Sequence, residues 1–265
     1  MYHTYRCAIL KVNMTQKATQ SWSIIILCSN EANSIKRVVT ESLNVLDKIS
    51  TKDRQIVIVN DGSTDDSDAI ILKLQELNQD IVYIKHKVNK GIGAALHSGY
   101  QNACMENVVM VSGDGQFDVK ELIPFKHIPN DSYISFYRAE NHLYNQQRKL
   151  LSLVNRLINY LFLGLNLKDV NYTNAYKTKH LKGLNLKVKS SLVESEICAK
   201  LSYLGKTAIE VKSSYHQNIN SKSTGASYKI VKQAFVDIPK LILSYNLFKR
   251  KVKQQVISRD FNHIV

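Results

Sequence analysis

Glycine and proline are scarce in this chain of 265 residues, which contains 10 Gly and 3 Pro. A fold of many short strands joined by tight turns uses both residue types heavily, so the composition disfavours an all-β fold. The same scarcity leaves no obvious flexible linker between domains. We therefore expect one large α/β domain, for which the length is sufficient.

Cysteine is also rare, and its four copies lie far apart, at Cys7, Cys28, Cys104 and Cys198. Their spacings match no metal-binding pattern, and no CxxC…H finger occurs. Aromatic residues do not interleave with basic residues on strand-like segments, so the sequence predicts no nucleic-acid-binding module. We expect reduced thiols in a cytosolic protein.

Long apolar runs are missing too. No stretch of about 18 apolar residues occurs, so the sequence predicts no membrane-spanning helix. Residues 1–20 lack the apolar core of a signal peptide, and we expect them to form a poorly ordered lead-in. Acidic residues are fewer than basic ones: the chain has 22 Asp and Glu and 36 Lys and Arg, which gives a net charge of +14. Such a field favours anionic lipid or phosphorylated substrates, unless it only reflects a Lys-rich composition.

What the chain does contain is a regular alternation of short apolar runs and helical patterns. Apolar runs rich in β-branched residues predict buried strands, and apolar residues at helical spacing predict helices. The predicted strands cover 23–28, 55–60, 81–85 and 107–112, and the predicted helices cover 34–49, 65–77 and 91–104. This order predicts βαβ units and a parallel sheet, in which ligands bind at the carboxyl ends of the strands.

The second half of the chain is less regular. We expect strands at 132–137 and 206–211 and helices at 146–165, 188–204 and 227–248. The last of these has an apolar face over 230–248 and runs into Lys249, Arg250 and Lys251. Such a face lies in a bilayer interface or packs on the domain's own core, and the sequence leaves both open. We treat 21–226 as the main domain and 227–265 as an amphipathic, basic tail.

Polar clusters follow the predicted strands at the edge where a ligand would bind. Asn30 and Glu31 follow the first strand and Asp61 follows the second. Asp61 is placed to accept hydrogen bonds from a base or a ribose hydroxyl, although the segment 60–65 also suits an ordinary turn and helix cap. Lys90 and Gly91 precede a helix start, whose free N–H groups suit a phosphate.

The fourth strand ends in Ser112-Gly113-Asp114-Gly115-Gln116. A carboxylate from Asp114 and an amide oxygen from Gln116, together with diphosphate oxygens, form a shell of hard ligands for Mg²⁺ or Mn²⁺. Such a metal neutralises charge on a departing nucleotide. The alternative is a polar turn before a helix.

In order and spacing, these motifs resemble those of family 2 glycosyltransferases with the GT-A fold, and most closely those of dolichyl- or polyprenyl-phosphate sugar transferases. The D-D-G-S-x-D motif is similar to residues 60–65, the N-x-G-x-G-x-A motif to 89–95, and the D-x-D-x-Q metal motif to 112–116, with Ser112 in place of its first Asp. The resemblance extends over residues 21–230, through segments at 148–155, 173–177, 194–200 and 225–229. It implies a mostly parallel, Rossmann-like sheet with flanking helices.

The resemblance implies an inverting displacement at the anomeric carbon of a UDP- or GDP-sugar. Asn30, Glu31, Asp61, Lys90, Gly91, Gly113 and Asp114 would bind the nucleotide, and Asp114 with Gln116 would hold the metal-bound diphosphate. A phosphate acceptor needs cations rather than a general base, whereas an alcohol acceptor needs a base. The cations on offer are Arg138, Arg148, Lys149 and Lys177, which favours a polyprenyl phosphate at the inner face of the membrane.

Alternatives remain at this point. Glu194 and Glu196 could serve a sugar hydroxyl as acceptor, or they could form a helix face with one of them paired to a lysine. A degenerate GT-A domain would bind nucleotide without turnover, and the serine at position 112 points in that direction. A different nucleotide-binding enzyme, such as a nucleotidyltransferase or a dehydrogenase, is a third class. The lack of G-x-G-x-x-G after the first strand counts against the dehydrogenase.

Overall fold

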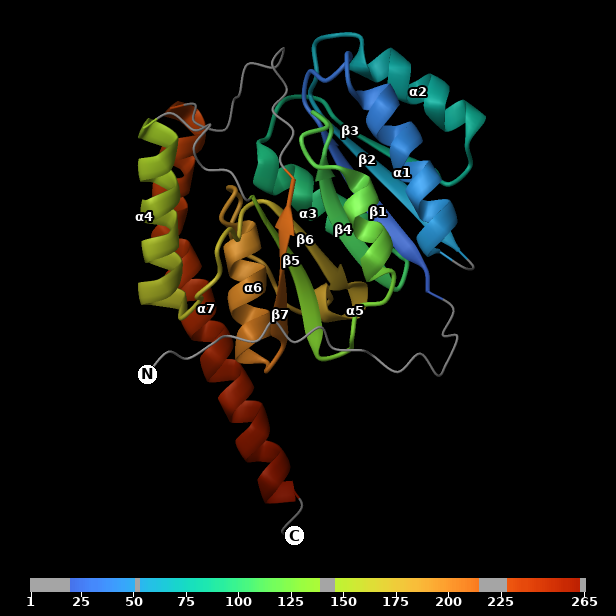
Figure 1. The fold of residues 1–265 in the computed structure, drawn as a ribbon. Coiled ribbons are helices and arrows are strands. Elements are labelled where there is room, and N and C mark those ends of the chain that lie inside the picture. Colours follow the sequence, from blue (N-terminus) through green and yellow to red (C-terminus); the bar gives the residue numbers. More distant parts are fainter. Residues whose placement is uncertain (1–19, 51–52, 139–145, 215–227, 263–265) are drawn as a thin grey trace, which may run out of the picture.

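The computed structural model describes residues 20–50, 53–138, 146–214 and 228–262. One seven-stranded sheet runs through the molecule in the order β3-β2-β1-β4-β6-β5-β7 (Figure 1). Its strands are β1 (Trp22–Cys28), β2 (Arg54–Asp61), β3 (Ile81–His86), β4 (Asn107–Ser112), β5 (Ser132–Arg138), β6 (Thr173–Lys177) and β7 (Thr207–Ser213). Of these seven described strands, only β6 runs antiparallel to its neighbours, so the predicted mostly parallel sheet is confirmed.

Helices cover both faces of this sheet, as a buried parallel sheet requires. One face carries α1 (Ile35–Ile49), α2 (Ser67–Leu77) and the short 3₁₀ helix η1 (Val119–Phe125), whose apolar residues share a core with β1, β2 and β4. The other face carries α3 (Ile92–Asn102) and α6 (Val193–Tyr203), and α5 (Thr178–Leu181) follows β6. The two longest helices, α4 (Gln146–Leu163) and α7 (Tyr228–Asn262), lie side by side outside α6 (Figure 1).

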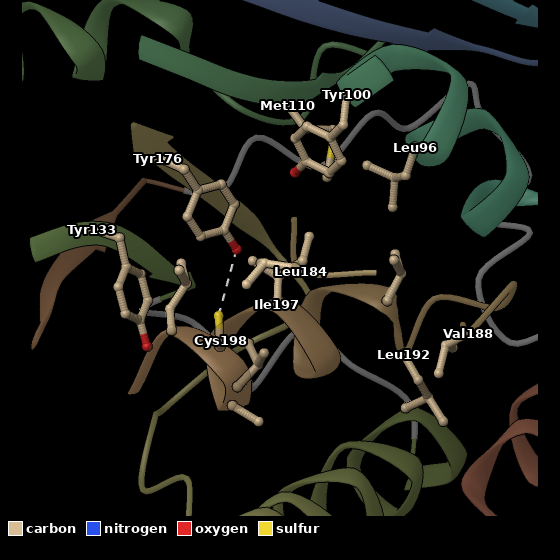
Figure 2. Close-up of a cluster of buried hydrophobic side chains, with 14 of the residues drawn as sticks. Leu96, Tyr100, Met110, Tyr133, Tyr176, Leu184, Val188, Leu192, Ile197 and Cys198 are labelled. Atoms are coloured by element: carbon tan, nitrogen blue, oxygen red, sulfur yellow. Dashed lines mark hydrogen bonds between the residues drawn. The ribbon is translucent and has the colours of Figure 1, made fainter. Parts of the chain in front are cut away.

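The core between the sheet and α6 is built from aromatic and aliphatic side chains. Figure 2 shows Tyr100 of α3, Tyr133 of β5 and Tyr176 of β6 gathered beside α6. The Tyr176 hydroxyl lies 3.5 Å from the Cys198 sulfur. All residues from Val193 to Leu201 are buried, so α6 is enclosed on every side rather than amphipathic. Cys28, Cys104 and Cys198 are free thiols, and Cys7 lies outside the described residues.

The apolar face expected over 230–248 packs on the domain itself. Leu241 is fully buried and Tyr245 is 8% exposed, both within the core beneath α6. Ala234, Ile238 and Phe248 pack against the same core. These five residues of the expected face therefore pack on the core, whereas Phe235 of the same face is 57% exposed. Within the described part of the chain, no helix is both long and apolar enough to cross a bilayer.

Candidate active site

The carboxyl ends of β1, β2 and β4 meet at one edge of the sheet. Their register is set by parallel pairing, with Leu27 opposite Ser112 and Cys28 opposite Asn60. The turn after β1 is tied directly to the turn after β2. The Asn30 side-chain oxygen accepts a hydrogen bond of 2.8 Å from the Thr64 backbone N–H, and the Asn30 N–H donates to the Ser63 hydroxyl at 2.9 Å. Three polar clusters thus converge as predicted.

Asp61 is the link between β2 and the segment that precedes α3. Its Oδ1 accepts a hydrogen bond from the Lys90 backbone N–H at 2.9 Å, and its Oδ2 accepts one from the Gly91 N–H at 2.8 Å. The His86 Nδ1 lies 2.7 Å from Oδ1 and must donate, because a carboxylate only accepts. Asp61 is 4% exposed. In this structure it therefore fixes the turn before α3, and its contact with a base or ribose stays a prediction.

Two glycines make the close approach at this corner possible. Gly62 has φ +68°, and a Cβ there would collide with the backbone of Val88 and Asn89. A Cβ on Gly93, in the first turn of α3, would collide with the carbonyl of Lys189. The loop at 184–192 therefore packs directly on the start of α3, the helix end that the sequence assigns to a phosphate.

The turn after β4 is packed against the turn after β1. The Gly113 N–H donates to the Leu27 carbonyl at 2.7 Å, and the Ser34 hydroxyl donates to the Gly113 carbonyl at 2.7 Å. A Cβ on Gly113 would lie 2.7 Å from the Leu27 carbonyl oxygen, closer than real Cβ contacts come. Only glycine fits there, and its neighbour Asp114 is held beside the residues that follow β1.

Glu31 and Asp114 are partly buried carboxyl groups on neighbouring turns, close enough for the charge of Asp114 to act on Glu31. Burial, and then the negative charge of Asp114, raise the pKa of Glu31 to about 7. Burial also raises the pKa of Asp114, while the Gln116 N–H, the Ser112 hydroxyl and the charge of Arg138 act in the opposite direction. The sequence predicts that Glu31 binds the nucleotide and gives it no part in metal binding. In the structure, its carboxyl group lies within electrostatic range of Asp114, the proposed metal ligand.

This pair fits a divalent cation held jointly with a nucleotide. Two crowded carboxyl groups with raised pKa values are stabilised when a cation binds them. In the described ranges, no group of three or more His, Cys, Asp or Glu side chains could hold a metal ion by itself. Diphosphate oxygens and the Gln116 amide oxygen would have to complete the shell, as hard-ligand chemistry allows.

Arg138, at the end of β5, brings positive charge to the same edge. Its guanidinium donates to Asp169 at both carboxylate oxygens, at 2.7 and 3.1 Å, and its Cζ lies 4.9 Å from the centroid of the Tyr172 ring. The Tyr172 hydroxyl donates to the Gln116 carbonyl at 3.3 Å. Neither Asp169 nor Tyr172 was predicted from the sequence, because nothing in the segment before β6 marks them out.

Two other predicted cations are placed differently. Lys177 is 1% exposed, and its ammonium lies 2.6 Å from Glu106. Because β6 runs antiparallel, Lys177 pairs with Asn107 at the first residue of β4, so it lies at the opposite end of the sheet from Asp114. The structure does not bring Lys177 to the site. Arg148 lies in the first turn of α4, and its side chain is outside the described residues.

Glu194 and Glu196 are buried and fully engaged. Glu194 accepts hydrogen bonds from Tyr100, Tyr176 and Asn174 at 2.5–3.0 Å. Glu196 is paired with Lys200 at 2.6 Å, as the helix-face alternative expected. With exposures of 2% and 0%, neither carboxylate is accessible to an acceptor hydroxyl.

The family model described as "Glycosyl transferase family 2" matches residues 23–176, more than half of the chain. This chain therefore belongs to the family 2 glycosyltransferases, as the motifs predicted. The match begins in β1 and ends in β6, so it includes Glu31, Asp61, Asp114 and Arg138.

Curated relatives match over shorter stretches. A dolichyl-phosphate beta-glucosyltransferase of Trichomonas vaginalis is 31% identical over 144 residues, 49% of this chain and 45% of that protein. A poly-beta-1,6-N-acetyl-D-glucosamine synthase of Staphylococcus epidermidis is 26% identical over 110 residues, 42% of this chain and 26% of that protein. The chain thus spans less than half the length of these relatives.

Solved structures confirm the GT-A fold. A glucosyl-3-phosphoglycerate synthase from Mycobacterium tuberculosis, in complex with Mn²⁺, UDP-glucose and phosphoglyceric acid, superposes with a TM-score of 0.57 at 13% identity. The alignment covers 83% of this chain and 80% of that one. The same enzyme in complex with UDP gives a TM-score of 0.56 at 14% identity, with the same coverage. At this level of identity the likeness concerns the fold.

Proposed function

We propose that this protein transfers a sugar from a UDP-sugar, with Mg²⁺ or Mn²⁺, to a polyprenyl phosphate at a membrane surface. The observation that carries the proposal is the Glu31–Asp114 pair next to Arg138, at the edge where β1, β2 and β4 end. An acidic pair that suits a cation, with an arginine beside it, is the arrangement needed to bring a diphosphate and a phosphate together.

On the donor side, Asp61 keeps the start of α3 in place. It uses the N–H groups of Lys90 and Gly91, so the next N–H groups of α3 are the ones that remain for a diphosphate. Asp114, Gln116 and Glu31 would hold the divalent cation. When bound, the cation neutralises charge on the leaving nucleotide.

On the acceptor side, Arg138 would orient the phosphate. Asp169 and Tyr172 hold the guanidinium from two directions, so little side-chain entropy remains to be lost on binding. A phosphate oxygen is already an anion and needs no base to attack the anomeric carbon. The burial of Glu194 and Glu196 supports this acceptor over a sugar hydroxyl, because neither can take up a proton from an incoming alcohol.

A second candidate is transfer to a sugar hydroxyl. The staphylococcal relative is a poly-beta-1,6-N-acetyl-D-glucosamine synthase, and Glu31, with its pKa raised to about 7, could accept a proton as a general base. Binding of a cation by Glu31 would remove this capacity, so the two roles exclude each other.

The test is transfer from radiolabelled UDP-glucose, UDP-N-acetylglucosamine and GDP-mannose, with Mn²⁺, to polyprenyl phosphate in detergent or to an oligosaccharide. We expect labelled lipid from one UDP-sugar. Asp114→Asn should lower kcat by about 100-fold, the range for losing one electrostatic stabiliser of the transition state. Asp53→Asn, an exposed carboxylate remote from this edge, is the matched control and should change nothing. Label in the oligosaccharide alone would favour the second candidate, and label in neither acceptor would refute both.

A further inference from the structure

Helix α4 presents an uncovered apolar face. Five large side chains on it are 53–63% exposed, and we call them the leucine face: Leu150, Leu153, Leu157, Tyr160 and Leu161. Their spacing of 3, 7, 10 and 11 residues from the first places them within an arc of about 100° on a helix with 3.6 residues per turn. A contiguous apolar stripe of this kind differs from the single exposed apolar residues that any surface has.

The opposite side of α4 is attached to the domain. Asn159 is 2% exposed, and Leu163 is 3% exposed within the core beneath α6. The neighbouring helix α7 adds four large exposed apolar residues, namely Phe235, Val236, Leu243 and Leu247. The surface formed by α4 and α7 lies on the side of the molecule away from α1 and α2 (Figure 1).

These two helices carry far more positive than negative charge. The segments 146–163 and 228–262 contain eleven Lys or Arg residues against two Asp, a net charge of +9 out of +14 for the whole chain. One of these acids, Asp237, is fully buried and bonded to Lys240 at 2.9 Å. Arg156 on α4 and Lys232, Arg250, Lys251 and Lys253 on α7 are exposed.

We propose that the leucine face of α4 docks the protein on an anionic lipid bilayer, with the cations of α4 and α7 beside the headgroups. Two interactions hold a helix at a bilayer interface: its apolar side chains are buried at the boundary of the acyl chains, and its lysines are attracted to anionic headgroups. A second copy of this chain fits poorly, because pairing this face with itself would bring +9 against +9.

Docking through α4 would bring the protein to its lipid acceptor, so this inference rests on the proposed function. Arg138 and Gln146, the first residue of α4, are eight positions apart, a distance that the chain spans in at most about 28 Å. The amino end of α4, where the leucine face begins, is therefore within about 28 Å of the arginine proposed to orient a lipid phosphate. The leucine face is on α4 and is distinct from the 230–248 face that the sequence predicts.

The experiment is co-sedimentation of the full chain with vesicles that contain no polyprenyl phosphate, so that it does not depend on glycosyl transfer. The vesicles are phosphatidylcholine alone or phosphatidylcholine with one quarter phosphatidylglycerol. We expect binding to the anionic vesicles, weakened at high salt. The double variant Leu153→Ser/Leu157→Ser should lower the partition coefficient at least tenfold. The matched control is Leu72→Ser/Leu77→Ser on α2, where the side chains are 44% and 84% exposed, and it should bind as the unaltered protein does.

Circular dichroism and thermal unfolding of both double variants confirm that they fold. Absence of binding by the unaltered protein, or equal binding by the α4 variant, would overturn the proposal. Light scattering tests the alternative, in which a second copy of the chain covers this face. If the unaltered protein is a dimer that does not bind vesicles, and the α4 variant is a monomer, the face is a dimer interface and the proposal is wrong.

Discussion

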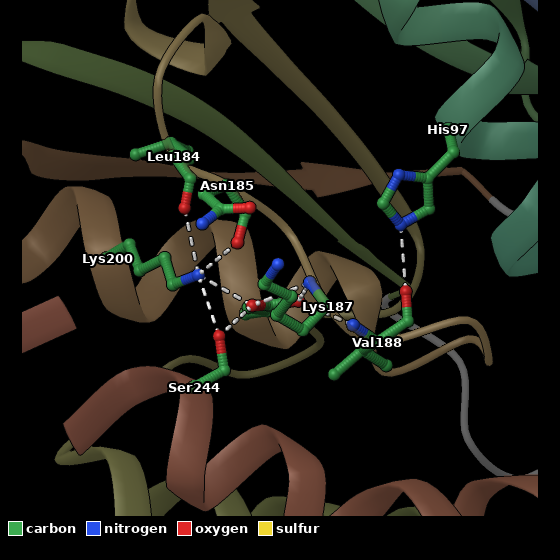
Figure 3. A network of polar contacts seen from close by, with 8 residues as sticks. His97, Leu184, Asn185, Lys187, Val188, Lys200 and Ser244 are labelled. Atoms are coloured by element: carbon green, nitrogen blue, oxygen red, sulfur yellow. Dashed lines mark hydrogen bonds and ion pairs between the residues drawn. The ribbon is translucent and has the colours of Figure 1, made fainter. Parts of the chain in front are cut away.

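Lys200→Met should destabilise the protein strongly, because it breaks a buried network that joins three parts of the fold (Figure 3). The Lys200 ammonium donates to Glu196 at 2.6 Å, to Ser244 at 3.0 Å and to the Leu184 carbonyl at 2.9 Å. Both charged side chains are almost fully enclosed, with exposures of 1% for the lysine and 0% for the glutamate. Methionine keeps most of the volume and removes only the charge and the donors.

The size of the expected loss of stability follows from the Glu196 carboxylate, which stays buried without its cation. Removing one partner of a buried ion pair costs about 3–5 kcal/mol, since the other charge stays in the protein without compensation. Among the described residues, Glu196 would keep hydrogen bonds only from the Lys187 and Val188 N–H groups, at 2.9–3.1 Å, and from Ser244 at 2.5 Å. A loss of this size is a large share of the total stability of a domain.

Urea unfolding followed by circular dichroism measures the effect, and a double variant isolates its cause. Glu196→Gln/Lys200→Met removes the buried charge and keeps an oxygen for the two N–H groups, so it should be more stable than Lys200→Met alone. The loop at 184–192 packs on the start of α3 and is bonded to it, because His97 lies 2.8 Å from the Val188 carbonyl. We therefore also expect a raised KM for the donor. A loss below about 1 kcal/mol, or a double variant no better than the single one, would refute the reasoning.

Three further predictions concern the site. Asp61→Ala should lower both the unfolding temperature and the affinity for UDP measured by calorimetry, because it releases the turn before α3; Asp61→Asn, which keeps one acceptor oxygen, should lose less. Glu31 has a folded pKa of about 7, above its ordinary value, so the folded state binds this proton more tightly than the unfolded state, and stability should fall as pH rises from about 4.5 to 7. Glu31→Gln should flatten that slope in unfolding experiments, and unaltered protein should bind Mn²⁺–UDP more tightly at pH 8 than at pH 6. Ser112→Asp should restore Mn²⁺ affinity to Glu31→Gln; no recovery would show that the two positions do not share a cation.

The strands that carry the site could be predicted from the sequence, because each is buried on both faces and reads as an unbroken apolar run. β1, β2 and β4 begin and end within about one residue of the predicted 23–28, 55–60 and 107–112. Their parallel pairing then places the following polar turns together without further information. Asp114 and Glu31 could be found in this way, since both lie in such turns.

Features that depend on distant partners could not be predicted. β6 is a strand of five residues that includes the buried polar Thr173 and Asn174, and it shows neither an apolar run nor an alternating pattern. Helix α6 begins at Val193 rather than near 188, because Glu196 accepts the N–H groups of 187 and 188 and draws that segment into a loop. The sequence predicts Lys177 as a cation of the site, because its partner Glu106 lies 71 positions away and cannot be recognised from the sequence.

Ser112 is the position where the sequence departs from the metal motif, and the fold explains how a site can persist there. The parallel register places Ser112 opposite Leu27, four residues before Glu31. The Ser34 hydroxyl lies 3.1 Å from Glu31 Oε2 and 2.7 Å from the Gly113 carbonyl oxygen, so the turn after β1 is fixed against the turn after β4. A second carboxylate, Glu31, therefore lies against Gly113, the residue before Asp114, although it follows a different strand. Meanwhile the Ser112 hydroxyl bonds to Asp114 and adds no third negative charge to a pair whose pKa values are already raised.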